Sequence, residues 1–219
     1  MNVATHGLPM EDASRFGLPR AALLRIADAI AAAEGKTSAE IRVVVTRAPL
    51  VQHPFFSILW AALAALVLPW LVLFAEPLPA LTLLSLQAAL FVVMASVMLL
   101  PNIAPRVIPR LALKSAARST AVEMFLAHGI PQTSGRTGIL ILAAARERIV
   151  EVVADEGVHT PLGHGAWRDI CEAVAERARH GDLAEGLVAG VEKAGELLSG
   201  PLPHRPGDRD ELANHVIVL

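Results

Sequence analysis

The stretch of sequence that decides the fold is residues 55–100, which read FFSILWAALAALVLPWLVLFAEPLPALTLLSLQAALFVVMASVMLL and contain Glu76 as their only charged residue. Residues 55–75 and 78–100 are apolar runs, and a helix needs about 20 such residues, at about 1.5 Å each, to cross a bilayer core. Between them, Glu76 and two prolines break the helix. The stretch therefore predicts a transmembrane hairpin of two helices. The alternative is a pair of helices buried in a soluble core, but such helices normally keep a polar face.

Charged residues on either side of this stretch predict its orientation. The flanks carry Arg42, Arg47, Arg106, Arg110, Lys114 and Arg118, whereas the hairpin tip carries no basic residue. Basic residues accumulate on the cytoplasmic side of membrane helices. Residues 1–17 lack the apolar core of a secretory signal. We therefore expect a multi-pass protein of the cell inner membrane with both termini in the cytoplasm.

Composition limits the partners of the remaining chain. The net charge is −2 and only 4% of the residues are aromatic, so neither a basic footprint nor stacking platforms for nucleic acid are present. The single cysteine, Cys171, excludes an intramolecular disulfide. About 170 residues lie outside the hairpin, which is enough for one compact domain. The membrane is therefore the partner that the composition predicts.

Periodicity outside the hairpin predicts alternating helices and strands. We expect helices over residues 19–35, 109–128, 167–181 and 182–198, and strands over residues 41–46, 137–143 and 149–154, the last two forming an antiparallel pair. In the second helix, the predicted apolar side contains Leu111, Val122, Phe125 and Leu126. The predicted fold class is α/β. A membrane hairpin inserted between a strand and a helix need not disrupt such a domain, because its two ends lie close together.

The predicted organisation has five segments. Residues 1–17 form a flexible leader, 18–54 and 101–200 are the two parts of one domain, 55–100 are the hairpin, and 201–219 are a tail. The last four residues, VIVL, are too apolar to stay in water. We therefore expect the tail to dock on the domain as an edge strand or in a groove.

The candidate chemistry lies after the third strand. Asp155, Glu156, His159 and His164 fall within ten residues, and carboxylate and imidazole groups are metal ligands, so Asp155, Glu156 and His159 are the predicted metal site. The favoured alternative is that Asp155 and His164 brace a turn. Residues 133–138 contain two glycines but precede a strand, so they are a turn rather than a phosphate loop. No catalytic residue and no bound organic cofactor are predicted; a bound metal would be Ca²⁺ or Mg²⁺.

Several of these pieces together resemble the bacterial membrane-anchored members of the TPM-domain family. The resemblance is carried by residues 40–45 (EIRVVV), 136–141 (RTGILI), 147–151 (ERIVE), Ala154-Asp155, Trp167, Gly181-Asp182 and 211–214 (ELAN). It covers most of residues 15–219 and implies an α/β/α sandwich around a short mixed sheet. Some relatives are associated with weak acid phosphatase activity and calcium binding, and others with the assembly or repair of membrane complexes. Asp155 matches a recurrent aspartate of the family, whereas the acidic pair that metal-binding relatives carry before their first helix has only Glu11-Asp12 as its nearest counterpart.

Two functional classes follow. In the first, the protein is a membrane-tethered interaction, assembly or accessory subunit of a membrane complex. In the second, it is a weak phosphatase that depends on a divalent metal. The sequence favours the first class, because a membrane tether is evident whereas a catalytic constellation is not.

Overall fold

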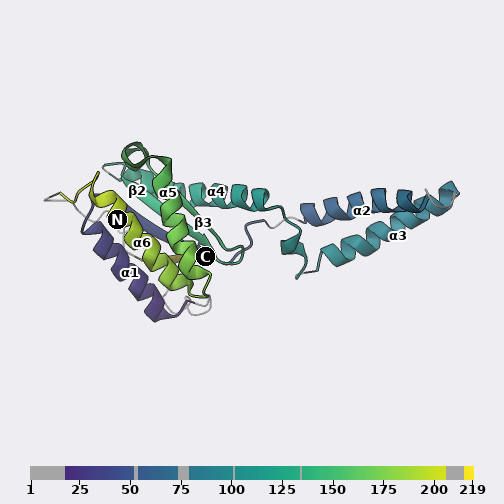
Figure 1. Ribbon diagram of the computed structural model, residues 1–219, viewed down its shortest axis with the longest axis horizontal. Helices are drawn as coiled ribbons and strands as arrows, with labels where there is room; N and C mark the ends of the chain where they lie inside the picture. The colour runs from purple at the N-terminus through teal and green to yellow at the C-terminus, as the bar shows by residue number, and fades with distance from the viewer. Residues whose placement is uncertain (1–17, 52–53, 74–78, 101, 134, 206–214) are drawn as a thin grey trace, which may run out of the picture. The chain divides into compact units, whose positions relative to one another are not determined.

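The structure is a computed structural model that describes residues 18–51, 54–73, 79–100, 102–133, 135–205 and 215–219. The chain forms two compact units. We call residues 1–50 with 115–219 the sheet unit and residues 51–114 the helical unit (Figure 1). The leader predicted over 1–17 and the hairpin tip predicted around Glu76 lie outside the described residues.

The sheet unit is built on a four-stranded mixed sheet in the order β3-β2-β1-β4. β1 (Glu40–Thr46) is parallel to β2 (Gly138–Ala144) and to the short β4 (Ile217–Val218). β2 is antiparallel to β3 (Ile149–Ala154). The predicted mixed α/β class and the antiparallel pair are confirmed. β1 and β2 are the inner strands and are buried along nearly their whole length, as their continuous apolar runs predict.

Three helices cover one face of the sheet. They are α1 (Arg20–Glu34), α5 (Glu156–Ala178) and α6 (Leu183–Ser199), and Figure 1 shows them on the same side of the strands. Because successive strand side chains point to opposite faces, alternate residues of β1 and β2 join this core: Ile41, Val43, Val45, Ile139, Ile141 and Ala143.

The opposite face is covered by α4 (Arg110–Ala127) and the 3₁₀ turn η3 (Ile130–Gln132). Its core consists of Val44, Leu140, Leu142, Val153, Ala121, Phe125 and Ile130. The predicted apolar side of this helix was wrong in three of four positions. Phe125 is buried, but Leu111, Val122 and Leu126 are exposed. The alanines at 117 and 121 occupy the inner face instead, because small side chains let the helix lie close to the sheet.

α5 begins much earlier than predicted. A turn was expected before the Trp167 helix, over residues 155–164, yet the helix starts at Glu156. At the start of this helix, Gly157 packs directly against the backbone before β2, and its N–H donates to the carbonyl of Arg136 at 3.1 Å. A Cβ at Gly157 would lie 2.6 Å from that same carbonyl oxygen. Contact with a distant segment therefore overrides the local loop signal.

The helical unit contains α2 (Phe55–Leu73), α3 (Ala80–Met98) and the 3₁₀ turn η2 (Ala104–Arg106). Among the described residues, α3 alone is both long and apolar enough to cross a membrane. The apolar part of α2, Phe55–Leu71, is shorter. α2 and α3 pack together, and the Ser57 hydroxyl at the start of α2 donates to the Met98 carbonyl at the end of α3 at 2.9 Å. The two helices therefore run antiparallel.

Candidate functional site

Asp155 begins α5 and is the best-buried acidic side chain of the predicted cluster. Only 5% of it is exposed. Its Oδ1 accepts a hydrogen bond from the backbone N–H of Glu156 at 2.7 Å, so the carboxylate caps the helix. Its Oδ2 is buried and accepts no hydrogen bond within the described part of the protein. Asp155 therefore has one structural role and one oxygen still available.

Arg136 lies directly over this carboxylate. Its Nη2 is 3.1 Å from Asp155 Oδ1 and its Nη1 is 3.5 Å from Glu156 Oε2. Arg136 has a positive φ of 50°, which turns the chain just before β2. A turn was predicted over residues 133–138, and the described residues Gly135 and Arg136 form one just before β2. The Arg136 contact was missed because no local pattern reports a left-handed residue. The arginine pairs with both carboxylates that the metal prediction required and offsets one of their two negative charges.

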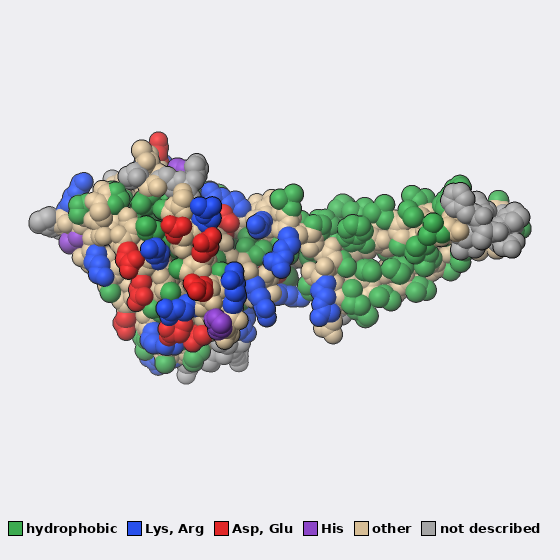
Figure 2. All heavy atoms as spheres, viewed as in Figure 1, with side chains coloured by type: hydrophobic (Ala, Val, Ile, Leu, Met, Phe, Trp, Pro, Cys, Tyr) green, Lys and Arg blue, Asp and Glu red, His purple; other side chains and the backbone are tan. Residues whose placement is uncertain are grey.

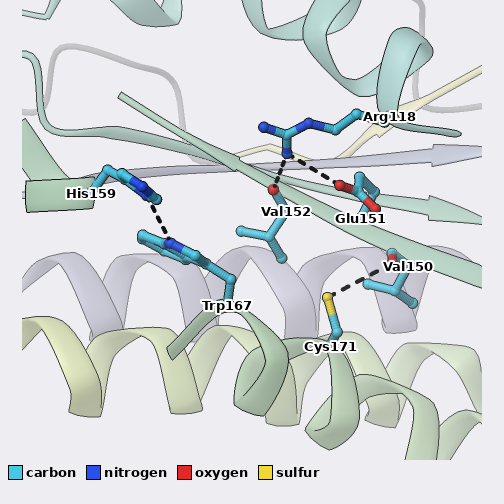
Figure 3. Close-up of polar contacts among 7 residues, drawn as sticks. All are labelled: Arg118, Val150, Glu151, Val152, His159, Trp167 and Cys171. Carbon is cyan, nitrogen blue, oxygen red and sulfur yellow. Dashed lines mark hydrogen bonds and ion pairs between the residues drawn. The ribbon is translucent and has the colours of Figure 1, made fainter. Parts of the chain in front are cut away.

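His159 is in contact with an aromatic neighbour. The indole N–H of Trp167 donates to His159 Nδ1 at 3.0 Å, and the two rings are stacked with centroids 6.0 Å apart (Figure 3). Because an indole nitrogen can only donate, Nδ1 must be the acceptor, and it cannot bind a metal while this bond stands. His164 lies in the same helix, but its side chain is outside what the structure describes.

Across the described residues, no three His, Cys, Asp or Glu side chains form a group that could hold a metal ion. The metal site at Asp155, Glu156 and His159 therefore stays a prediction. The arrangement supports the bracing role for Asp155, which holds the start of α5 against the turn before β2.

This acidic cluster lies at one end of the sheet, and the chain leaves for the helical unit at the other. The N–H of Asp155 donates to the carbonyl of Gly138 at 2.9 Å, beside the start of β2. β1 is parallel to β2 and ends at Thr46, so residues 47–54 depart from the opposite end. Six steps of about 3.3 Å separate the two ends of such a strand, roughly 20 Å. A ligand at Asp155 would thus bind far from the strand end that leads to α2.

Two histidines and a buried arginine form a second cluster that the sequence analysis missed. Arg42 was expected to flank the membrane, but it is only 6% exposed within β1. Burial and the nearby Arg42 charge lower the pKa of both His128 and His215. His128 follows α4, and His215 lies two residues before β4. The sequence did contain a signal for the burial of Arg42. Arg42 and Val44 are two residues apart in one strand, so both side chains point to the face that α4 covers.

These two histidines predict that acid destabilises the sheet unit. An unfolded histidine titrates near pH 6.5, whereas the lowered pKa values mean that the folded protein takes up these protons only at lower pH. Below about pH 6.5 the unfolded chain therefore binds more protons, and stability falls as the pH drops. We expect the melting temperature to decrease on acidification, and to decrease less in the double variant His128→Gln/His215→Gln. An equal decrease in both proteins would contradict this assignment.

The edge strand β3 is protected by side chains from both sides of the sheet (Figure 3). Arg118 of α4 donates to the Val152 carbonyl at 2.8 Å and pairs with Glu151 at 3.1 Å. The Cys171 thiol of α5 lies 3.7 Å from the Val150 carbonyl. Burial, followed by the charges of Glu151 and Glu172, raises the pKa of Cys171 to about 11. The thiol therefore stays protonated and is a poor nucleophile, and the edge is blocked against further strand pairing.

The capping role of Asp155 can be tested against a second helix cap. Asp155→Asn keeps an acceptor oxygen but loses the charge beside Arg136, so we expect a loss of about 1 kcal/mol of stability. Asp182 caps α6 by accepting from Glu185 N–H at 3.0 Å, and no ion pair with it appears among those of the described residues. Asp182→Asn should lower the stability by less than Asp155→Asn does.

Thermal unfolding measures the stability of both variants, and Ca²⁺ or Mg²⁺ should not shift the unfolding curve of the wild type or of Asp155→Asn. A metal-induced rise in the wild type that Asp155→Asn abolishes would establish the metal site instead.

Comparison with known proteins assigns the family. Residues 103–197 match the family model described as the TPM domain. This part of the chain is a TPM domain. The matched region runs from the turn before α4 into α6, so it includes Arg136, Asp155 and Trp167. The resemblance inferred from the sequence is confirmed, although the matched region is shorter than the 15–219 expected.

One solved structure has a similar fold. The NMR structure of the BA42 protein from the psychrophilic bacterium Bizionia argentinensis superposes with a TM-score of 0.59, covering 92% of this chain and 95% of that chain at 20% sequence identity. Similarity at this level of identity shows the fold alone. No curated protein sequence matches the chain.

Proposed function

We propose that this TPM-domain protein is tethered to the cell inner membrane by α2 and α3 and serves as an interaction, assembly or accessory subunit of a membrane complex. The observation that carries the proposal is the surface of α3. None of its side chains is buried, and Leu81, Leu84 and Val92 are 78%, 61% and 62% exposed. A core helix of a soluble protein would be mostly buried. An exposed apolar surface of this kind marks an interaction or membrane site.

Polar groups within the two helices support a lipid environment. The hydroxyls of Ser85 and Ser96 donate to the carbonyls of Leu81 and Val92, four residues earlier, at 2.8 and 2.7 Å. Ser57 donates across to the Met98 carbonyl. In a bilayer every polar group needs an internal partner, because no water is present. These three serines therefore present no unsatisfied hydroxyl to lipid.

The distribution of charge supports the cytoplasmic orientation. Arg106, Arg110 and Lys114 follow α3 within the helical unit and are exposed. Figure 2 shows the surface of α2 and α3 as almost uniformly hydrophobic, with basic side chains at one end. In addition, the Trp60 indole N–H, near the start of α2, donates to the Val107 carbonyl at 2.9 Å. Tryptophan and basic residues are typical of the interface between lipid and cytoplasm.

A hydrolase remains the second candidate because of one atom, the buried Oδ2 of Asp155 that accepts no hydrogen bond in the described structure. A divalent ion at this oxygen would give the metal-dependent phosphatase class. However, Arg136 already pairs with both Asp155 and Glu156 and offsets one of their two charges, and Trp167 occupies His159 Nδ1. The contacts of the described residues therefore favour the tethered interaction subunit.

A cysteine-labelling experiment tests the tether and its orientation. In a Cys171→Ser background, a cysteine at Leu78 should react with a membrane-impermeant thiol reagent added outside intact cells. A cysteine at Glu192, in α6, should react only after the membrane is permeabilised. If the cysteine at Leu78 is protected while the cysteine at Glu192 is labelled in intact cells, the orientation is wrong. If neither cysteine is labelled in permeabilised cells, the variants are misfolded. Thermal unfolding of each variant beforehand excludes misfolding. Purification in mild detergent would then identify the subunits that accompany the protein.

A further inference from the structure

Three arginines lie together at the end of the sheet from which the chain departs toward α2. Arg47 directly follows β1, and Arg146 and Arg148 lie in the turn between β2 and β3. Thr46 of β1 is paired with Ala144 of β2, and the Ala145 N–H donates to the Thr46 carbonyl at 2.9 Å. Adjacent strands are about 4.8 Å apart. The backbones that carry the three arginines are therefore neighbours. We call these residues the arginine edge.

The arginine edge carries a net positive charge. All three side chains are exposed, and none of them takes part in the ion pairs found among the described residues. The nearest acidic residue in sequence, Glu147, accepts a hydrogen bond from the Leu50 N–H at 3.3 Å. Glu151, at the start of β3, is paired with Arg118. Glu151 is thus paired outside the edge, whereas Glu147 bonds a neutral N–H and keeps its negative charge, so the three arginines and Glu147 together carry a net charge of about +2.

The chain itself limits how far this edge can lie from the first helix of the proposed tether. Eight residue steps separate Arg47 from Phe55, and a fully extended chain spans at most about 3.5 Å per step, roughly 28 Å in total. The electrostatic attraction of an anionic membrane acts within about one Debye length, near 8 Å at physiological salt. A linker that runs along the membrane surface, and not away from it, therefore brings the edge within range of lipid headgroups.

We propose that the arginine edge binds anionic lipid headgroups, and that this second contact holds the sheet unit against the membrane. The inference rests on the proposed membrane tether. Arginine suits this ligand because its planar guanidinium forms paired hydrogen bonds with phosphate oxygens. In this docked position, the Asp155 end of the sheet points into the cytoplasm and stays open to a partner.

Quenching by lipid headgroups tests the proposal in the full-length protein. A bimane label is placed at Ala145→Cys in the Cys171→Ser background, and the protein is reconstituted in vesicles that contain spin-labelled phosphocholine. Each basic residue near an anionic surface shifts binding about fivefold. Quenching should therefore be strong with phosphatidylglycerol present, weak in phosphatidylcholine alone, and reversed by high salt. The triple variant Arg47→Gln/Arg146→Gln/Arg148→Gln should lower the ratio of docked to undocked protein by on the order of a hundredfold.

A charge-matched control separates the arginine edge from a general effect of net charge. Lys36→Gln/Arg168→Gln/Lys193→Gln also removes three positive charges, from residues outside the edge, and should leave the quenching unchanged. The proposal is overturned if the edge variant is quenched like the wild type, if phosphatidylcholine alone gives equal quenching, or if the control variant loses quenching equally. Vesicle flotation in high salt distinguishes a failure of the arginine contact from a failure of the membrane tether. Without the tether the protein leaves the vesicles, whereas without the arginine contact it floats with them unquenched.

Discussion

Two arginines placed in the middle of α3, at Ala88 and Val92, should abolish stable insertion of this helix. Both positions are exposed and lie one helical turn apart near its centre. An arginine at the centre of a membrane helix costs about 2.5 to 3.5 kcal/mol on insertion scales, so the pair costs about twice that. We expect the Ala88→Arg/Val92→Arg variant to be extracted from membranes by alkaline carbonate, where the wild type is retained.

The matched control places the same two charges on exposed apolar residues of the sheet unit. Leu24 of α1 and Leu126 of α4 are 48% and 63% exposed. Leu24→Arg/Leu126→Arg should stay in the membrane fraction like the wild type, because these side chains are not assigned to lipid. If the α3 variant is also retained, α3 is not a membrane span. Loss of both variants would instead indicate that the membrane association of this protein is generally weak.

Gly186→Ala should strongly destabilise the sheet unit, although it adds only one methyl group. A Cβ at this position of α6 would lie 2.6 Å from the Val174 carbonyl oxygen and 3.2 Å from the Ala178 nitrogen, both backbone atoms of α5. Neither can move without displacing a helix. Overpacking typically costs about 1 to 3 kcal/mol, and we expect the melting temperature to fall by about 2 to 4 °C for each kcal/mol.

Gly165 provides the control for this substitution. It lies inside α5, and a Cβ there would meet no atom within 4 Å. Gly165→Ala should therefore gain the higher helix propensity of alanine, up to about 1 kcal/mol, and raise the melting temperature. Opposite signs for the two variants, measured by thermal unfolding in detergent, would support the close contact of α5 with α6. A rise at Gly186 would show that the helices are further apart.

The candidate site shows where local sequence information was sufficient. Asp155 was expected to cap or brace a turn before the Trp167 helix, and it does cap a helix, α5. Its partner Arg136 lies nineteen positions earlier and approaches only because β2 and β3 pair. His159 was grouped with the carboxylates on proximity in sequence, yet it pairs with Trp167 two helical turns later. Spacing along a chain identifies residues on one helix face, but not the partner that another segment supplies.

The sequence by itself determined the properties that depend on local runs and periods. These are the apolar stretch that contains α2 and α3, the buried strands β1 and β2, the antiparallel β2–β3 pair and the TPM-domain resemblance. Each follows from side chains within a few residues of one another, because helix and strand periods are short-range.

Only the tertiary structure decided which helix faces are covered and which charges are paired. It buried Arg42 while leaving Arg47 exposed, packed the alanines of α4 on the sheet while exposing Leu111 and Leu126, and extended α5 through a predicted loop. The physical reason is common to all three. Burial and pairing depend on the shape and charge of segments that are distant in sequence, and contacts with those segments outweigh local preferences of about 1 kcal/mol or less per residue.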